Sequence, residues 1–437
     1  MRHADAPRPP LGISLGSSLR ISPAIRLGTG LRISPATSLK TRRAVSRAGR
    51  IALIGVLILV RQAALEAQDR PGGRFSTGPV TWSPTISLRD AGIDSNIYDQ
   101  SVDPREDRMA ILTPQLDVVL DSPHFKLQGT GVVDVVYFER HAGERTINRK
   151  VVMRAELPFS RLAPFVTGTY ERAHDRQGFE VDLRADREAV SGGLGVLWSV
   201  TPRGALRVTA SQGDNTYDAG QTFRGLDLAR ELSRTTQTAT LGFQYTLSPF
   251  TTLTFDVSGG RERYRKSSRD SQDVRALIGV TFAPDAIVRG HAAFGYHLLD
   301  TKSPQVPFKG FHADVGLGYT LLGVTRFDVR FGRDTGVSVD APYFLQTDYG
   351  LEIQQTLFGP LFLLARGSRQ LLDYPGIPQL LYDARIDRSE TYGGGLAMQM
   401  TGAARATVTW EATRRLSTIA LGNFSRQRLL SSFTFAF

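Results

Sequence analysis

The sequence of 437 residues contains no cysteine. This absence excludes a disulfide framework, a thiolate metal site and a cysteine-linked lipid anchor. The sequence also lacks a run of about 20 apolar residues, the length that a transmembrane helix requires. From about residue 80 onward it shows no apolar stripe with helical spacing. These absences favour a body built of strands.

The body of the chain, after residue 67, also carries very little net charge. The formal net charge is +11, but residues 1–67 hold 11 basic and two acidic side chains, which leaves 42 basic and 40 acidic groups for the rest. The excess of positive charge therefore belongs to the first segment. A phosphate-binding surface in the body is not supported, and we expect no nucleic-acid partner.

The first segment resembles an export signal. The apolar residues 51–60, IALIGVLILV, follow the basic stretch TRRAVSRAGR and precede the small residue Ala67. This order predicts a signal peptide over 45–67, cleaved after Ala67, and a periplasmic segment over 68–79. A short membrane anchor and a buried helix are the alternatives. Residues 1–44 repeat LRISPA and predict a disordered low-complexity leader; one explanation is a later translation start, for example at Val45.

Short stretches of the body alternate strictly between apolar and polar residues. Examples are LTFDVS at 253–258, RFDVRF at 326–331 and RATVTWE at 405–411. A period of two predicts β-strands with one apolar and one polar face. Tight turns built on Pro or Gly recur about every 40 residues, and longer polar stretches lie between them. Each period is therefore a hairpin with a short turn at one end and a longer loop at the other.

Two all-β architectures have this periodicity. A β-propeller would need four short strands per period, whereas a transmembrane antiparallel β-barrel needs two long ones. We predict a barrel over 80–437 with about eighteen strands, short periplasmic turns and longer extracellular loops. The stretch at 80–89 is the first strand although it contains Pro84, and sixteen strands is the fallback. Aromatic residues close to the tight turns predict an interfacial belt; they are Phe159, Phe165, Trp198, Tyr245, Phe250, Phe282, Tyr319, Phe358 and Phe362.

With these features the chain resembles Gram-negative outer-membrane β-barrel proteins. The C-terminal Phe433, Phe435 and Phe437, on alternate positions, are similar to the assembly signal of that class, which the barrel-assembly machinery recognises. The stretch GIDSNIYD at 92–99 is similar to a motif near the mature N-terminus of the β-barrel porin family associated with exopolysaccharide loci. The resemblance implies insertion in outer-membrane lipid and transport.

The phase of the strands predicts which charged residues line the lumen. Balanced charges of both signs favour weak ion selectivity or cross-strand pairs that stiffen the wall. The predicted pore-lining residues are Lys126, Asp134, Arg154, Glu156, Arg207, Asp256, Arg275, Arg289, Asp314, Arg326, Asp328, Arg330, Glu352, Arg405 and Glu411, together with Asp117.

Two polar groups could have other roles. Asp94, Ser95 and Asn96 could bind calcium, but a turn after the first strand is the favoured interpretation. His291 and His297 share a strand face, and His312 and Asp314 follow on the next predicted strand. Spacing alone does not bring these four together, so lumen lining is favoured over a metal site. We predict no metal, no cofactor and no catalytic residue.

The predicted function is passage of small hydrophilic solutes, or of oligosaccharide in connection with surface-polysaccharide export, through an outer-membrane barrel of porin size. The alternatives are a structural or adhesion barrel with a closed lumen and an outer-membrane enzyme.

Overall fold

The computed structural model describes residues 74–176, 180–181, 183–284, 286–303, 306–376, 383–419 and 422–437. The predicted leader and signal peptide lie outside the described residues, as do 68–73 of the predicted periplasmic segment. The last residues of that segment form β1, which pairs with the start of β2. In the described part of the chain, no helix has the length and apolar character to cross a membrane.

Long strands make up nearly all of the described chain. Three short helices lie between them: η2 (Ala142–Glu144), α2 (Leu228–Glu231) and η3 (Ser267–Arg269). The strands are β1 (Phe75–Thr77), β2 (Val80–Asp94), β3 (Asp107–Asp121), β4 (Lys126–Phe138), β5 (Thr146–Glu156), β6 (Leu162–Arg176), β7 (Arg184–Ser199), β8 (Gly204–Tyr217), β9 (Thr222–Phe223), β10 (Leu226–Asp227), β11 (Arg234–Ser248), β12 (Thr251–Tyr264), β13 (Ser271–Phe282), β14 (Val288–Thr301), β15 (Phe308–Leu321), β16 (Thr325–Gly336), β17 (Phe344–Phe358), β18 (Leu361–Tyr374), β19 (Arg385–Gln399), β20 (Ala404–Leu416) and β21 (Phe424–Ala436).

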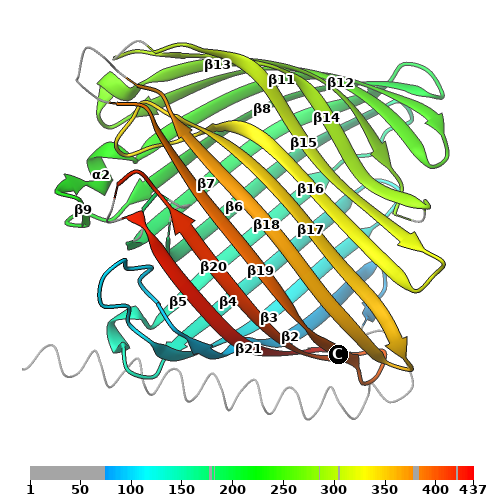
Figure 1. Cartoon of the computed structure of the whole chain (residues 1–437). Helices are drawn as coiled ribbons and strands as arrows, with labels where there is room; N and C mark the ends of the chain where they lie inside the picture. Colours follow the sequence, from blue (N-terminus) through cyan, green and yellow to red (C-terminus); the bar gives the residue numbers. More distant parts are fainter. Residues whose placement is uncertain are drawn as a thin grey trace, which may run out of the picture. The chain divides into compact units, whose positions relative to one another are not determined.

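The long strands close into a barrel (Figure 1). Each pairs antiparallel with its neighbours in sequence, and β2 pairs with both β3 and β21. Apart from β1 and the small β9–β10 hairpin, eighteen strands form this ring. The predicted transmembrane barrel of eighteen strands is therefore confirmed. Short turns join the strands at one end, called here the short-turn end, and longer segments join them at the other, the long-loop end.

The pairing of β2 with β21, which closes the barrel and is called here the seam, accommodates a proline. Register pairs run from Thr85–Ala436 to Asp94–Arg428. Pro84 lies just beyond them, and its carbonyl accepts a hydrogen bond from the N–H of Phe437. Because the N and the C=O of a strand residue point to the same neighbour, the missing N–H of Pro84 faces only the last residue of the chain. The proline thus costs the seam little.

The GIDSN stretch links β2 to β21 at the long-loop end of the seam. The buried carboxylate of Asp94 accepts from the N–H of Asn96 at 3.0 Å and from Nε of Arg426, on β21, at 2.8 Å. The stretch therefore forms the predicted turn and joins the first strand to the last. A Cβ on Gly92 would lie 1.9 Å from the carbonyl oxygen of Leu429, so only glycine allows this close approach.

The two faces of the sheet differ in character. Val408, Trp410, Leu429 and Phe433 share the outer face, and each exposes 40% or more of its surface, which suits contact with lipid.

Two aromatic residues were wrongly assigned to the interfacial belt. Phe165 pairs with Glu156, and Phe362 belongs to the same inner face. The guanidinium groups of Arg154 and Arg405 lie over these rings, 3.7 and 5.9 Å from the centroids. Phe165 is the fourth residue of β6 and Phe362 the second of β18, and proximity to a turn does not reveal which face of the sheet a side chain occupies.

Candidate functional site: a charged inner wall beneath a loop cap

The charged residues predicted from the strand phase all lie on one face of the sheet. The register pairs that carry this placement link Lys126 with Glu156 on β4–β5 and Asp328 with Glu352 on β16–β17. Further register pairs place other predicted residues on the same face of the sheet: Gly242–Asp256, Arg289–Gly318, Gly393–Glu411 and Arg405–Thr434.

This face is the concave one. Nη2 of Arg405, on β20, lies 3.1 Å from Oε1 of Gln354, on β17, so the contact passes over two strands. Nη1 of Arg275, on β13, reaches Oδ2 of Asp334, on β16, at 3.2 Å in the same way. Side chains can reach past intervening strands only where the sheet curves toward them. We call this face the inner wall.

Ion pairs of both signs run along the inner wall. Several link predicted residues to each other: Arg154–Glu156 at 2.7 Å, Arg207–Asp256 at 2.6 Å, Arg326–Asp328 at 2.7 Å and Arg330–Glu352 at 3.5 Å. Others have partners that were not predicted: Lys126 with Asp121, Asp134 with Arg89, Asp314 with His291 and Arg275 with Asp334. Asp117 accepts from Thr130, and Arg289 packs beside Gly318. The wall is therefore charged yet internally compensated.

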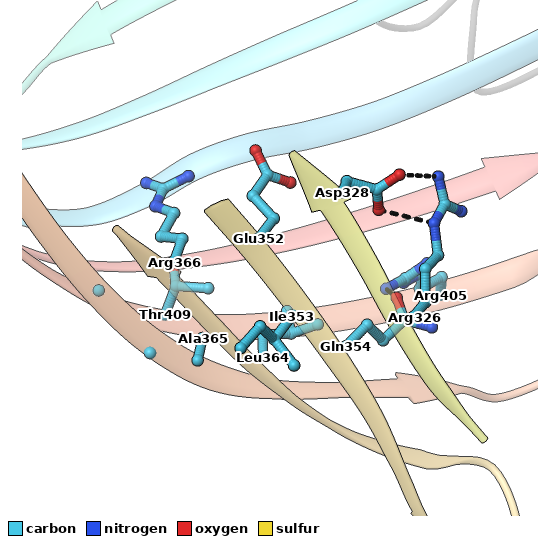
Figure 2. Close-up of a pocket in the computed structure, with 12 residues that line it drawn as sticks. Arg326, Asp328, Glu352, Ile353, Gln354, Leu364, Ala365, Arg366, Arg405 and Thr409 are labelled. Carbon is cyan, nitrogen blue, oxygen red and sulfur yellow. Dashed lines mark hydrogen bonds and ion pairs between the residues drawn. The ribbon is translucent and has the colours of Figure 1, made fainter. Parts of the chain in front are cut away.

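A pocket of about 270 Å³ lies where β16 to β20 contribute to the wall (Figure 2). Asp328, Glu352 and Arg366 project into it from three successive strands, and Arg326 pairs with Asp328 beside them. A neighbouring pocket of about 400 Å³ shares these three residues and adds Glu411 and Arg428. Together they form a polar groove with donors and acceptors of both charges, of the size that holds a small hydrophilic molecule.

Arg366 and Arg428 are residues of the groove that the sequence interpretation missed. Both contact the buried carboxylate of Glu411: Nη2 of Arg428 lies 2.6 Å from Oε2, and Arg366 pairs with Oε1. Arg366 follows LFLLA, where apolar residues on both faces hide the alternation. Arg428 could have been predicted as an inner-wall residue, because the alternation of the two faces along the last strand extends from Phe437 back to position 428.

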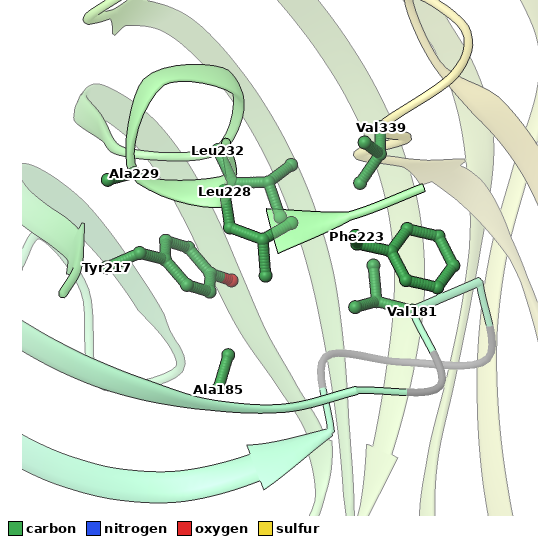
Figure 3. Packing of buried hydrophobic residues seen from close by; sticks show 8 residues of the cluster. All are labelled: Val181, Ala185, Tyr217, Phe223, Leu228, Ala229, Leu232 and Val339. Carbon is green, nitrogen blue, oxygen red and sulfur yellow. The ribbon is translucent and has the colours of Figure 1, made fainter. Parts of the chain in front are cut away.

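Loops from nearly opposite sides of the barrel meet at the long-loop end. A buried apolar cluster combines Val181, between β6 and β7, with Phe223 and Leu228, between β8 and β11, and with Val339, between β16 and β17 (Figure 3). Around the ring, six strands separate β7 from β16, and eight separate β17 from β6. A contact between these loops therefore bridges the mouth of the barrel. We call the described residues of these loops the loop cap.

A buried carboxylate joins the two sides of the loop cap. Glu180 accepts a hydrogen bond from the hydroxyl of Ser338 at 2.7 Å and another from the N–H of Val339 at 2.8 Å. Arg385 lies 3.6 Å from it, and Asp340 is close by. Burial raises the pKa of Glu180 above the ordinary glutamate value, a shift that its hydrogen bonds and Arg385 only partly oppose.

Arginine side chains hold the segment after β16 from further sides. Nη1 of Arg269, on η3, donates to the carbonyl of Val339 at 3.1 Å, and Nη2 donates to those of Ser338 and Ala341. Arg224 pairs with Asp340 at 3.0 Å. The segment 337–341 is therefore the centre of the loop cap.

Comparison with known proteins yields one family. A family described as "Putative beta-barrel porin 2" matches residues 76–437. No curated protein matches the sequence.

Solved structures of similar fold include OpdK from Pseudomonas aeruginosa, an outer membrane protein, at 9% identity, a TM-score of 0.47 and coverage of 82% of this chain and 99% of that one. OccK3 (OpdO) from the same organism has 10% identity, a TM-score of 0.46 and coverage of 82% and 95%. The FrpB iron transporter from Neisseria meningitidis has 10% identity, a TM-score of 0.41 and coverage of 77% and 61%.

The substitution Glu411→Gln tests the charge balance of the groove. It leaves Arg366 and Arg428 without their shared carboxylate, so we expect the free energy of unfolding to fall by roughly 3–5 kcal/mol. Glu352→Gln is the matched control: Glu352 pairs with Arg330 in an exposed part of the wall, where a pair contributes about 1 kcal/mol or less. Urea unfolding in lipid vesicles measures both. Equal losses would contradict the assignment.

Proposed function

We propose, from the premise that the chain belongs to the "Putative beta-barrel porin 2" family, that this porin-like outer-membrane β-barrel passes small hydrophilic solutes along its inner wall. The observation that carries the proposal is the concave wall of compensated Arg and carboxylate pairs with its groove at Asp328, Glu352 and Arg366. Barrels of this size can enclose an aqueous channel. The long-loop end would face outward and the short-turn end the periplasm, as in bacterial barrels.

The polar groups of the groove favour neutral, hydroxyl-rich solutes over ions of one sign. Because positive and negative groups alternate, neither sign of ion gains a continuous attractive path. Paired guanidinium and carboxylate groups can donate to and accept from neighbouring hydroxyls of a sugar. We therefore include oligosaccharide among the solutes, and with it the link to surface-polysaccharide export that the GIDSN resemblance suggests. The family is named for porins, which favours transport over an enzymatic role.

A structural barrel with a closed lumen is the second candidate. The loop cap favours it, because Glu180 and Ser338 meet across the mouth. The two candidates differ in whether the loop cap opens. We propose that the loop cap restricts the pore when it is closed and that it can open.

The last strand carries the proposed assembly signal. β21 places Phe433 and Phe435 on the outer face, and the ring of Phe437 packs edge-on against that of Phe435, 4.9 Å between centroids. An alternating aromatic strand end of this kind suits recognition by the barrel-assembly machinery before closure. Once the barrel is closed, Phe433 and Phe435 would contact lipid, whereas Phe437 is buried.

Conductance tests the proposed function. Purified protein in a planar bilayer should give stepwise currents, and Arg269→Ala, which removes three contacts to the centre of the loop cap, should give larger or more frequent openings. The exposed Arg230 on α2 supplies the control, Arg230→Ala, which should behave as wild type. A bilayer silent for every variant would favour the structural barrel instead.

Opening should also depend on pH through Glu180. Its pKa in the closed loop cap is raised, so protonation favours closure: this stabilisation is complete at acidic pH and is lost as the pH rises through the raised value. We expect the open probability to increase as the pH rises above the ordinary titration range of a glutamate. Glu180→Gln should keep the low opening of the acidic state at every pH. A pH response that survives in Glu180→Gln would contradict this role.

A further inference from the structure

Two histidines and an aspartate converge on the inner wall near the long-loop end. His297 on β14, His312 on β15 and Asp334 on β16 come from three successive strands, and one ligand atom from each lies within 4.8 Å of the others. Nδ1 of His297 is 3.1 Å and Nδ1 of His312 is 3.3 Å from the same oxygen, Oδ1 of Asp334. The sequence interpretation grouped these histidines with Asp314, but the register brings Asp334 to them instead, and Asp314 pairs with His291.

Three buried imidazole nitrogens in this cluster lie near carboxylate oxygens without forming a hydrogen bond of good geometry. Among the described residues they are Nδ1 and Nε2 of His297, a fully buried side chain, and Nδ1 of His312. A buried polar nitrogen that lacks a hydrogen bond is unfavourable. A metal ion among the three side chains would use these lone pairs.

The carboxylate of Asp273 supports metal coordination, whereas the guanidinium of Arg275 competes with a metal ion for Asp334. Arg275 lies 3.2 Å from Oδ2 of Asp334 and leaves Oδ1 to the histidines. Asp273 lies 3.6 Å from Nε2 of His297. A carboxylate on that side favours the tautomer that keeps the Nδ1 lone pair free for a metal, as outer carboxylates do in zinc sites.

We propose that His297, His312 and Asp334 bind a divalent transition-metal ion. Imidazole and carboxylate ligands suit Zn²⁺, Cu²⁺ and Ni²⁺, whereas Ca²⁺ and Mg²⁺ prefer oxygen ligands alone. Zinc–ligand distances of about 2.0–2.2 Å allow the observed 3.1–3.3 Å between ligand atoms. Three protein ligands leave a further coordination position for water or a solute. Zinc is the probe for the test.

Calorimetry with ZnCl₂ tests the site on the full, untagged chain, folded in detergent and stripped with a chelator. We expect about one ion per chain and at least tenfold weaker binding in His312→Ala and in Asp334→Asn. The matched control is His291→Ala, because His291 also pairs with an aspartate, at 3.1 Å, but is half-exposed and lies beyond the cluster. X-ray absorption of the zinc-bound protein should show two histidine ligands.

Heat-modified gel mobility shows whether each variant is folded, so a folding defect can be separated from lost binding. Binding that vanishes in His291→Ala, or that persists unchanged in folded His312→Ala and Asp334→Asn, would overturn the proposal. Absence of zinc binding to the folded wild type would do so as well, and would leave the proposed channel untouched, because the two measurements are independent.

Discussion

The structure depends on one constraint: in hydrocarbon, each backbone N–H and C=O needs a partner within the protein. A sheet can meet that requirement only by closing on itself. Here closure requires β21 to pair with β2, and the contacts that secure the pairing come from both ends of the seam. At one end the C-terminal residue bonds to Pro84, and at the other the carboxylate of Asp94 holds Arg426. The GIDSN stretch thus links the first and last strands of the ring.

Once the ring is closed, the alternation of side chains separates two environments. The outer face carries apolar residues, and the inner wall carries charges that compensate one another across strands. Pairs that pass over intervening strands, such as Arg405 with Gln354, stiffen a wide wall that has no apolar core to support it. Two buried apolar clusters of the described residues lie instead at the long-loop end. In the loop cap, Phe223 and Leu228 pack with Val339, and beside it Ala341 packs with Phe344, Leu372 and Tyr374. The apolar packing is therefore concentrated at the mouth.

The alternation in sequence was enough to predict the barrel, its eighteen strands and the face that carries Asp328, Glu352 and Glu411. It failed where the local pattern was ambiguous. Arg366 follows apolar residues on both faces, and Phe165 and Phe362 lie close to turns. The alternation could not predict contacts that depend on the register of several strands or on loops from opposite sides of the barrel. The cluster of His297, His312 and Asp334 needs three strands in register, and the contact of Glu180 with Ser338 joins residues 158 positions apart. Period-two patterns carry no information about either.

Because the chain contains no cysteine, single introduced cysteines give the most direct test of a closed barrel with a hydrated inner wall. Thr407 and Thr409 on β20 lie on the inner wall, and Val408 between them lies on the outer face. With the protein in lipid vesicles, a charged thiol reagent should modify Thr407→Cys and Thr409→Cys, while Val408→Cys stays protected by lipid. Equal modification at all three positions, or modification at 408 alone, would contradict the account.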